Sequence, residues 1–62
     1  MTVEQLIAYI PAYDLVTIIN QDSETIFKGF CVRIREQNRT DLLKLKIETI
    51  YTTGNIRIHV TE

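Results

Sequence analysis

The chain has 62 residues, of which 45% are hydrophobic and 24% are charged, and its formal net charge is −1. This composition is typical of one soluble globular domain over residues 1–62, and no apolar run approaches the ~20 residues of a membrane span. The single cysteine, Cys31, excludes an intrachain disulfide, and the N-terminus lacks the positive and apolar regions of a signal peptide. We therefore expect a cytoplasmic protein with no membrane contact.

A short helix is predicted at the N-terminus. Thr2 and Gln5 have the spacing of a capping box, in which each side chain bonds the backbone N–H of the other residue. The apolar residues that follow fall on one helical face, at Val3, Leu6, Ile7 and Ile10. Pro11 disfavours helical backbone at the residue before it, so we expect the helix to span residues 3–10. Two turns are not stable alone, so this helix must pack against a sheet.

The next segment predicts a hairpin of two strands. Residues 15–19 are mostly β-branched and apolar on both faces, which is typical of a central strand. Residues 20–23 have turn chemistry, and a second strand over residues 25–34 follows. Its even positions carry most of its apolar residues: Ile26, Phe30, Val32 and Ile34. Lys28 interrupts that pattern, and the neighbouring Gly29 indicates a bulge or a sharp bend.

The polar connection over residues 35–41 leads into the second half of the chain. Residues 40–43 favour one helical turn at the end of this connection. Apolar and charged residues then alternate, which predicts a half-buried strand over residues 43–48. The alternation breaks two residues later, so we expect a bulge near Thr49.

A tight turn and a last strand complete the predicted sheet. Gly54 supplies the positive φ that hairpin turns need, and residues 56–61 alternate apolar with polar side chains. The short connections favour an antiparallel meander. The predicted fold class is therefore α+β: a short N-terminal helix followed by a four-stranded antiparallel meander, either open or coiled into a small, partly open barrel.

No group of residues predicts catalysis, a metal site or a cofactor. His59 is the only histidine, and its neighbours in the strand pattern are surface types, so an exposed strand histidine is the better interpretation. Cys31 has the parity of Phe27 and Gly29, which favours a packed side chain over a nucleophile. Only two glycines are present, so there is no glycine-rich phosphate loop. We expect that the protein is not an enzyme.

Charge is distributed unevenly along the chain. Residues 1–27 hold four carboxylates and no Lys or Arg, a net charge of −4, whereas residues 28–46 hold six cations against two carboxylates, a net charge of +4. The basic segment predicts a contact surface for a partner, at Arg33, Arg35, Arg39, Lys44 and Lys46. Because one short helix covers only one sheet face, three apolar residues join this surface: Leu15, Ile19 and Tyr51. The competing interpretation is that acidic and basic strands neutralise each other and that barrel closure buries the apolar surplus.

Four short segments carry a family resemblance: TVEQLI (2–7), IPAYD (10–14), VTI (16–18) and IFKG (26–29). Over roughly its first half, the chain is similar to small uncharacterised proteins from phages and prophages of Gram-positive bacteria. Those proteins also open with a short helix, a "Y-[DE]-x-V-x-I" strand and an aromatic-x-Gly hairpin return. The resemblance implies no activity. It implies a phage context, in which compact accessory proteins often bind host proteins stoichiometrically and inhibit bacterial defence systems.

The leading hypothesis is a non-enzymatic, phage-type protein that acts by protein–protein binding in the cytoplasm of a bacterial host. We expect it to form a homodimer or small homo-oligomer and to inhibit a host or anti-phage defence protein. The first alternative is a small barrel that binds nucleic acid through residues 28–46, although a pI of about 5.7 counts against a dedicated nucleic-acid module. The second alternative is a structural subunit of a virion or larger assembly.

Overall fold

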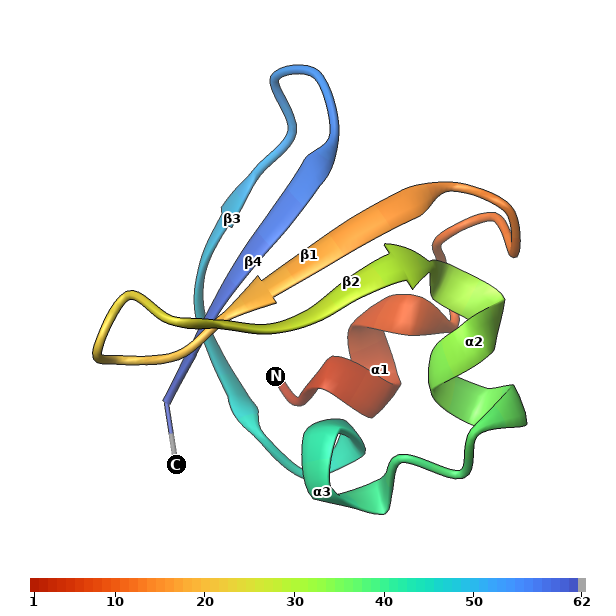
Figure 1. The fold of residues 1–62 in the computed structure, drawn as a ribbon, viewed down its shortest axis with the longest axis horizontal. Helices are drawn as coiled ribbons and strands as arrows, with labels where there is room; N and C mark the ends of the chain where they lie inside the picture. Colours follow the sequence, from red (N-terminus) through yellow and green to blue (C-terminus); the bar gives the residue numbers. More distant parts are fainter. Residues whose placement is uncertain (62) are drawn as a thin grey trace.

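The computed structural model describes residues 1–61, which fold into two layers (Figure 1). Short helices form one layer and a four-stranded sheet forms the other. In chain order the elements are α1 (Val3–Ile7), β1 (Leu15–Ile19), β2 (Thr25–Phe30), α2 (Cys31–Glu36), α3 (Thr40–Leu43), β3 (Lys46–Tyr51) and β4 (Ile56–Thr61). The α+β class predicted from the sequence is confirmed.

The sheet is mixed, so the predicted antiparallel meander is wrong. Its strands lie in the order β2–β1–β4–β3, and it is open rather than closed into a barrel. β1 pairs antiparallel with β2, and β3 pairs antiparallel with β4, but β1 and β4 lie parallel in the centre. This arrangement arises because the helical segment over residues 31–43 carries the chain from one edge of the sheet to the other. The prediction that residues 15–19 form a central strand is confirmed.

Residues 31–36 form a helix, so the predicted strand over residues 25–34 is wrong beyond Phe30. β1 begins at Leu15, which pairs with Phe30, and a longer second strand would therefore have no partner. The first two backbone N–H groups of α2 instead donate to carbonyls of the loop before β1, at 2.9 Å each. These bonds satisfy donors at the helix N-terminus, where no side chain caps α2.

The other helices follow the sequence more closely. The predicted capping box is present: Thr2 N donates to Gln5 Oε1 at 2.9 Å, and Gln5 N donates to Thr2 Oγ1 at 3.3 Å. α1 ends earlier than predicted, at Ile7, and a hydrogen-bonded turn continues to Ile10. The helical turn predicted over residues 40–43 is confirmed as α3.

The predicted irregularities of the two hairpins have different outcomes. A register shift in β3 just before Thr49 confirms the bulge expected there. The bulge expected at Gly29 is wrong, because the shift in the first hairpin lies at the end of β1, next to the turn. Gly54 has a φ of 75°, which confirms the predicted turn. The strand expected over residues 43–48 begins later, at Lys46, after the end of α3.

The core lies between the helices and one face of the sheet. Its buried residues are Val3, Ile7, Val16, Ile18, Phe27, Cys31, Ile34, Leu42, Ile58 and Val60. Cys31 and Ile34 are three residues apart and share the buried face of α2, where Cys31 has the packed position predicted from the sequence. The helices of residues 1–61 all lie on this side, so none of them covers the opposite face of the sheet (Figure 1).

Candidate functional site

The candidate metal ligands of residues 1–61 lie apart, and the thiol of Cys31 is buried. Within residues 1–61 no three His, Cys, Asp or Glu side chains lie close enough to hold a metal ion. Cys31 is 3% exposed, and burial raises the pKa of its thiol, which makes it a poor nucleophile. Its Sγ lies 3.9 Å from the carbonyl oxygen of Ile7, as expected for a packed side chain.

The sheet side that faces away from the helices, here called the open face, carries an ordered row of side chains. The register positions of the open face include Leu15, Thr17, Ile19, Lys28, Phe30, Lys46, Thr49, Tyr51, Arg57 and His59. Strand register pairs Lys28 with Thr17, Thr17 with Arg57, and Arg57 with Tyr51. Paired residues project from the same face, so these four side chains lie side by side across all four strands. Thr17 is half-buried, and the other three are exposed.

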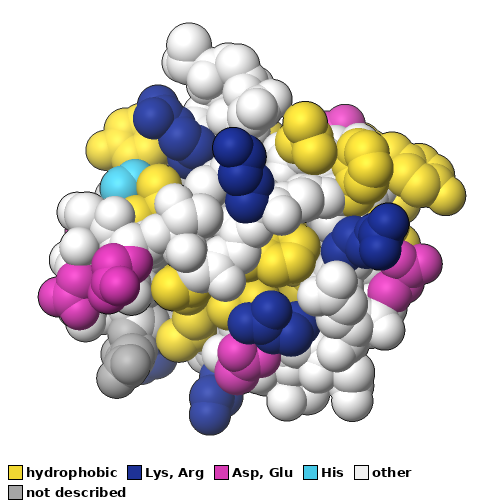
Figure 2. Space-filling model, viewed as in Figure 1, with side chains coloured by type: hydrophobic (Ala, Val, Ile, Leu, Met, Phe, Trp, Pro, Cys, Tyr) yellow, Lys and Arg dark blue, Asp and Glu magenta, His cyan; other side chains and the backbone are white. Residues whose placement is uncertain are grey.

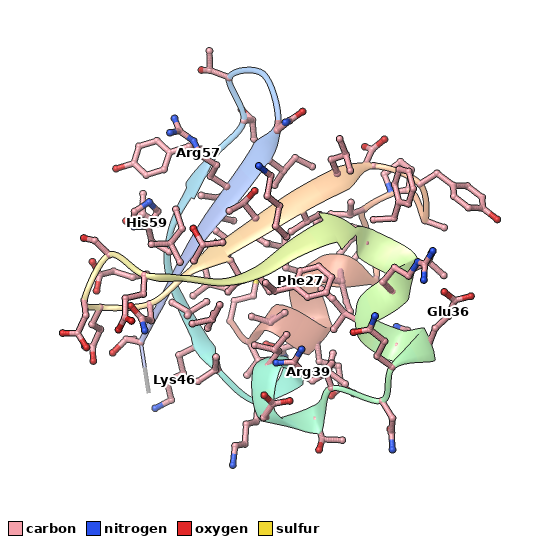
Figure 3. The ribbon with its side chains drawn as sticks, in the orientation of Figure 1. Phe27, Glu36, Arg39, Lys46, Arg57 and His59 are labelled. Atoms are coloured by element: carbon pink, nitrogen blue, oxygen red, sulfur yellow. The ribbon has the colours of Figure 1, made fainter. Side chains whose placement is uncertain are left out.

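Tyr51 and two neighbours form an aromatic cluster at one end of this row. The Tyr51 and His59 rings meet edge-on with their centroids 5.2 Å apart, and the Arg57 guanidinium lies 5.5 Å from the Tyr51 centroid. Arg57 and His59 project from the same side of β4, away from the helices (Figure 3). His59 is half-buried, so it is less exposed than predicted. The cluster combines ring surface with a cation, which suits an anionic or aromatic contact.

Large apolar side chains lie at the other end of the open face. Leu15 and Phe30 are register partners and are 46% and 40% exposed. The Tyr13 ring packs edge-on against Phe30, with 6.0 Å between the ring centroids. Tyr51, at the far end of the sheet, is also 46% exposed. The open face therefore combines exposed apolar side chains near both edges of the sheet with the two cations of the row, Lys28 and Arg57.

The free edge of β2, where the sheet ends, forms a second surface. Two hollows of about 320 and 650 Å³ follow one another along this edge, between β2 and the α2–α3 segment. We call them together the edge groove. Its apolar lining includes Ile26, Phe27, Leu42 and Leu45, and its charged lining is Lys28, Arg33, Arg39, Asp41 and Lys44. Figure 2 shows apolar atoms in a band across this side of the molecule, with Lys and Arg side chains along its borders.

The predicted contact residues separate onto different surfaces. The open face holds the three apolar candidates and one basic candidate: Leu15, Ile19, Tyr51 and Lys46. The edge groove holds Arg33, Arg39 and Lys44. Arg35 lies elsewhere, in a hollow that it shares with Ile7 at the end of α1 and with residues of the turn that follows. The structure thus brings together three of the five basic candidates, but not all eight residues on one surface.

Two cations of the edge groove have acidic neighbours. Arg39 Nε and Nη2 donate to Asp41 Oδ1 and Oδ2, both at 3.1 Å. This hydrogen bonding holds the pKa of Asp41 below its ordinary value and raises the pKa of Arg39. Arg33 lies 3.9 Å from Glu36, a looser pair. Exposed pairs of this kind stabilise a fold little, so their main effect is to hold the cations at the groove.

Besides Thr17, three residues of the row across the sheet and the aromatic cluster were not among the predicted contacts: Lys28, Arg57 and His59. The alternation of residues 56–61 already indicated that Arg57 and His59 face away from the core, so a signal for them was present. Lys28 was counted in the basic segment over residues 28–46 and interrupted the strand pattern, but neither signal placed it beside Arg57. Its alignment with Arg57 depends on the parallel pairing of β1 with β4, which no local pattern reveals.

No family model, curated protein or solved structure matches the chain. Over residues 1–61, none of the helices has the length and apolar character needed to cross a membrane.

Proposed function

We propose that this is a non-enzymatic, phage-type protein that acts by protein–protein binding, with the open face as its contact surface. The observation that carries this proposal is the exposure of Leu15, Phe30 and Tyr51 (46%, 40% and 46%) on a sheet face that no helix of residues 1–61 covers. Exposed apolar groups gathered on one face are typical of interfaces, where tyrosine often dominates the binding energy. The resemblance to phage proteins supports stoichiometric inhibition of a host or anti-phage defence protein.

The charge of the open face favours a partner with an acidic surface. Lys28 and Arg57 lie in the row that crosses the middle of the sheet. Two copies that met face to face would bring these cations together, and like charges across an interface are unfavourable. Self-association as a homodimer or small homo-oligomer stays a prediction. Light scattering at micromolar concentration tests self-association, and a monomeric mass would refute this prediction.

Affinity capture from the lysate of a Gram-positive host, followed by reconstitution of the complex from purified components, tests the proposal. Tyr51→Ala removes an aromatic side chain from the open face. The matched control Tyr9→Ala removes a tyrosine that is 85% exposed in the turn after α1. Truncation of a dominant interface tyrosine costs roughly 2 kcal/mol, or about thirtyfold in affinity. We expect Tyr51→Ala to lose the partner and Tyr9→Ala to retain it at a one-to-one ratio.

Other outcomes would contradict parts of the proposal. Equal affinity of the two variants for the reconstituted partner would exclude the open face as the contact surface. Particles much larger than a dimer, formed without any host protein, would favour the structural-subunit alternative instead.

The aromatic cluster favours a second candidate function, the binding of single-stranded nucleic acid. Tyr51 and His59 offer rings on which bases stack, while Arg57 and Lys28 lie in the same row to meet phosphates. Titration of labelled oligodeoxythymidine across salt concentrations tests this candidate. Binding should weaken steeply with salt, and Arg57→Ala should reduce the salt slope by about one. Absence of binding at low salt would exclude it.

A further inference from the structure

The free edge of β2 has backbone donors that the sheet does not use. Phe30 pairs with Leu15 in the register of the hairpin. One position further along, the Cys31 N–H donates to the carbonyl of Asp14 at 2.9 Å, so that position is a hydrogen-bonded pair. Bonded and non-bonded pairs alternate along an antiparallel ladder. Phe30 and, two residues earlier, Lys28 therefore occupy non-bonded pairs, and their N–H groups point outward from the sheet.

The edge groove lies directly beside these outward N–H groups. Ile26 and Leu45 are half-buried, and with the buried Phe27 and Leu42 they give the groove an apolar lining. Figure 3 shows Phe27 on the side of β2 that faces α3, and Arg39 on the side of α3 that faces β2. A chain extended along β2 would place every second side chain over this apolar surface, because strand side chains alternate between faces.

The charged lining of the edge groove is mostly positive. It contains Lys28, Arg33, Arg39 and Lys44 against a single carboxylate, Asp41, which gives a net charge of +3. Among residues 1–61, Lys28 and Lys44 have no ion-pair partner. A ligand that fills the groove would therefore be most stable if it supplied carboxylates.

We propose that the edge groove binds an extended acidic segment of another protein as a fifth strand, added to the free edge of β2. This names a partner chemistry for protein binding and so rests on the proposed function, although it uses a different surface from the open face. Strand addition combines main-chain hydrogen bonds with pockets for alternate side chains. A nucleic acid would meet the cations, but it has neither an amide ladder nor apolar side chains. A second copy would bring another groove of net charge +3 against the first.

The geometry specifies the pattern of the bound segment. Side chains that point toward the helices would contact Ile26, Leu42 and Leu45 and should be apolar. Side chains that point the other way would meet Lys28 and Arg33, which line the same hollow at the border of the open face, and should be acidic. β2 has six residues, so a segment of similar length is enough to pair along it. The groove should therefore select alternating apolar and acidic residues.

A fluorescent peptide of alternating valine and glutamate is the probe for this proposal. Two N-methylated versions of this peptide, the N-methylated twins, keep its charge and side chains. One twin carries methyl groups on every second backbone amide, and the other carries them on the remaining amides. Only one set can face β2 in a strand, so we expect one twin to bind at least about tenfold more weakly and the other to bind like the parent. In NMR spectra, the amides of Lys28 and Phe30 should shift and gain protection from hydrogen exchange when the parent peptide binds.

Protein variants give matched controls for charge and backbone. Arg33→Glu changes the edge groove, whereas Arg35→Glu makes the same change on the same helix outside it. We expect the first to weaken peptide binding by roughly tenfold and the second by less than about twofold. Phe30 has a φ of −67°, which proline adopts, so Phe30→Pro removes the outward N–H without breaking the ladder. Phe30→Pro should bind the peptide about tenfold more weakly than Phe30→Ala does. Circular dichroism should confirm that both variants fold.

Equal binding of the two N-methylated twins, or equal losses in Arg33→Glu and Arg35→Glu, would overturn strand addition. Protection of the Lys28 and Phe30 amides by oligodeoxythymidine alone would assign the groove to nucleic acid, and their protection in a peptide-free dimer would assign it to a second copy. Tyr51→Ala should leave peptide affinity unchanged, which separates this inference from the open face. If Tyr51→Ala loses the host partner but the unmodified protein binds no peptide, strand addition alone is refuted. If the unmodified protein binds the peptide but Tyr51→Ala keeps the host partner, the open face alone is refuted.

Discussion

The two phenylalanines of β2 lie on opposite faces of the sheet, so the same substitution should have very unequal effects at these positions. Phe27 is 8% exposed and belongs to the core, whereas Phe30 is 40% exposed on the open face. The sequence pattern grouped Phe30 with the apolar even positions of the predicted strand, and Phe27 has the opposite parity, yet Phe27 is the buried one. Alanine at each position therefore tests which side of β2 faces the helices.

The magnitudes follow from burial. Phe→Ala in a core costs about 3–5 kcal/mol, while a domain of 62 residues has a total stability of roughly 3–9 kcal/mol. Phe27→Ala should therefore remove between about a third and all of the free energy of unfolding, and Phe27→Leu, which keeps most of the volume, about 1 kcal/mol. Phe30→Ala loses part of a half-exposed ring and the edge-on contact with Tyr13, together about 1 kcal/mol.

Urea unfolding followed by far-UV circular dichroism measures these free energies, since the chain has no tryptophan to serve as a fluorescent probe. Phe27→Leu keeps the comparison measurable if Phe27→Ala does not fold. A larger loss for Phe30→Ala than for Phe27→Ala would refute the faces assigned to β2. The open face and the edge groove would then both be wrong, because each depends on the direction in which the residues of β2 point.

Three further predictions concern the ends of elements and the buried thiol. Thr2→Ala removes the acceptor of the Gln5 N–H and should cost about 1 kcal/mol in urea unfolding, whereas Thr2→Ser should cost much less. Ser23 has a φ of 63°, so Ser23→Gly should stabilise the turn by about 0.5–1 kcal/mol, and a lower thermal midpoint would contradict this. Burial raises the pKa of Cys31, so its contribution to stability is present below the unfolded pKa of about 8.5 and is lost as pH rises through the folded pKa. Cys31→Val should therefore flatten the fall of stability above roughly pH 8.5, and an unchanged slope would count against the burial of this thiol.

Local patterns predicted the elements whose determinants are local. The capping box of Thr2, the apolar run of residues 15–19 and the turn at Gly54 each act within a few residues, and all three are present. α2 was missed because Val32 and Ile34 alternate with arginines, which favours a strand. This segment forms a helix because β1 is short. Leu15, the first residue of β1, pairs with Phe30, so the residues after Phe30 have no strand partner, and a helix satisfies their backbone hydrogen bonds instead.

The candidate surfaces were predictable only in part, for a related reason. Side-chain parity placed Leu15 and Ile19 opposite the core residues of β1, and the structure agrees. The row from Lys28 to Arg57 requires the order of the strands, and the edge groove requires that β2 end the sheet. Both depend on the parallel pairing of β1 with β4, which joins residues about forty positions apart, and no short-range signal encodes that contact.

The exposed residues of the open face should be separable from the stability of the fold. Leu15 and Tyr51 are each 46% exposed, and neither belongs to the buried core. Leu15→Thr/Tyr51→Thr places β-branched residues, which strands favour, at both positions, so the free energy of unfolding should change by less than about 1 kcal/mol. If the open face is the contact surface, the same variant should lose partner binding by more than tenfold, because apolar contacts dominate such interfaces. A loss of stability as large as that of Phe27→Ala would mean that these side chains hold the sheet together, and their exposure would then no longer argue for a partner.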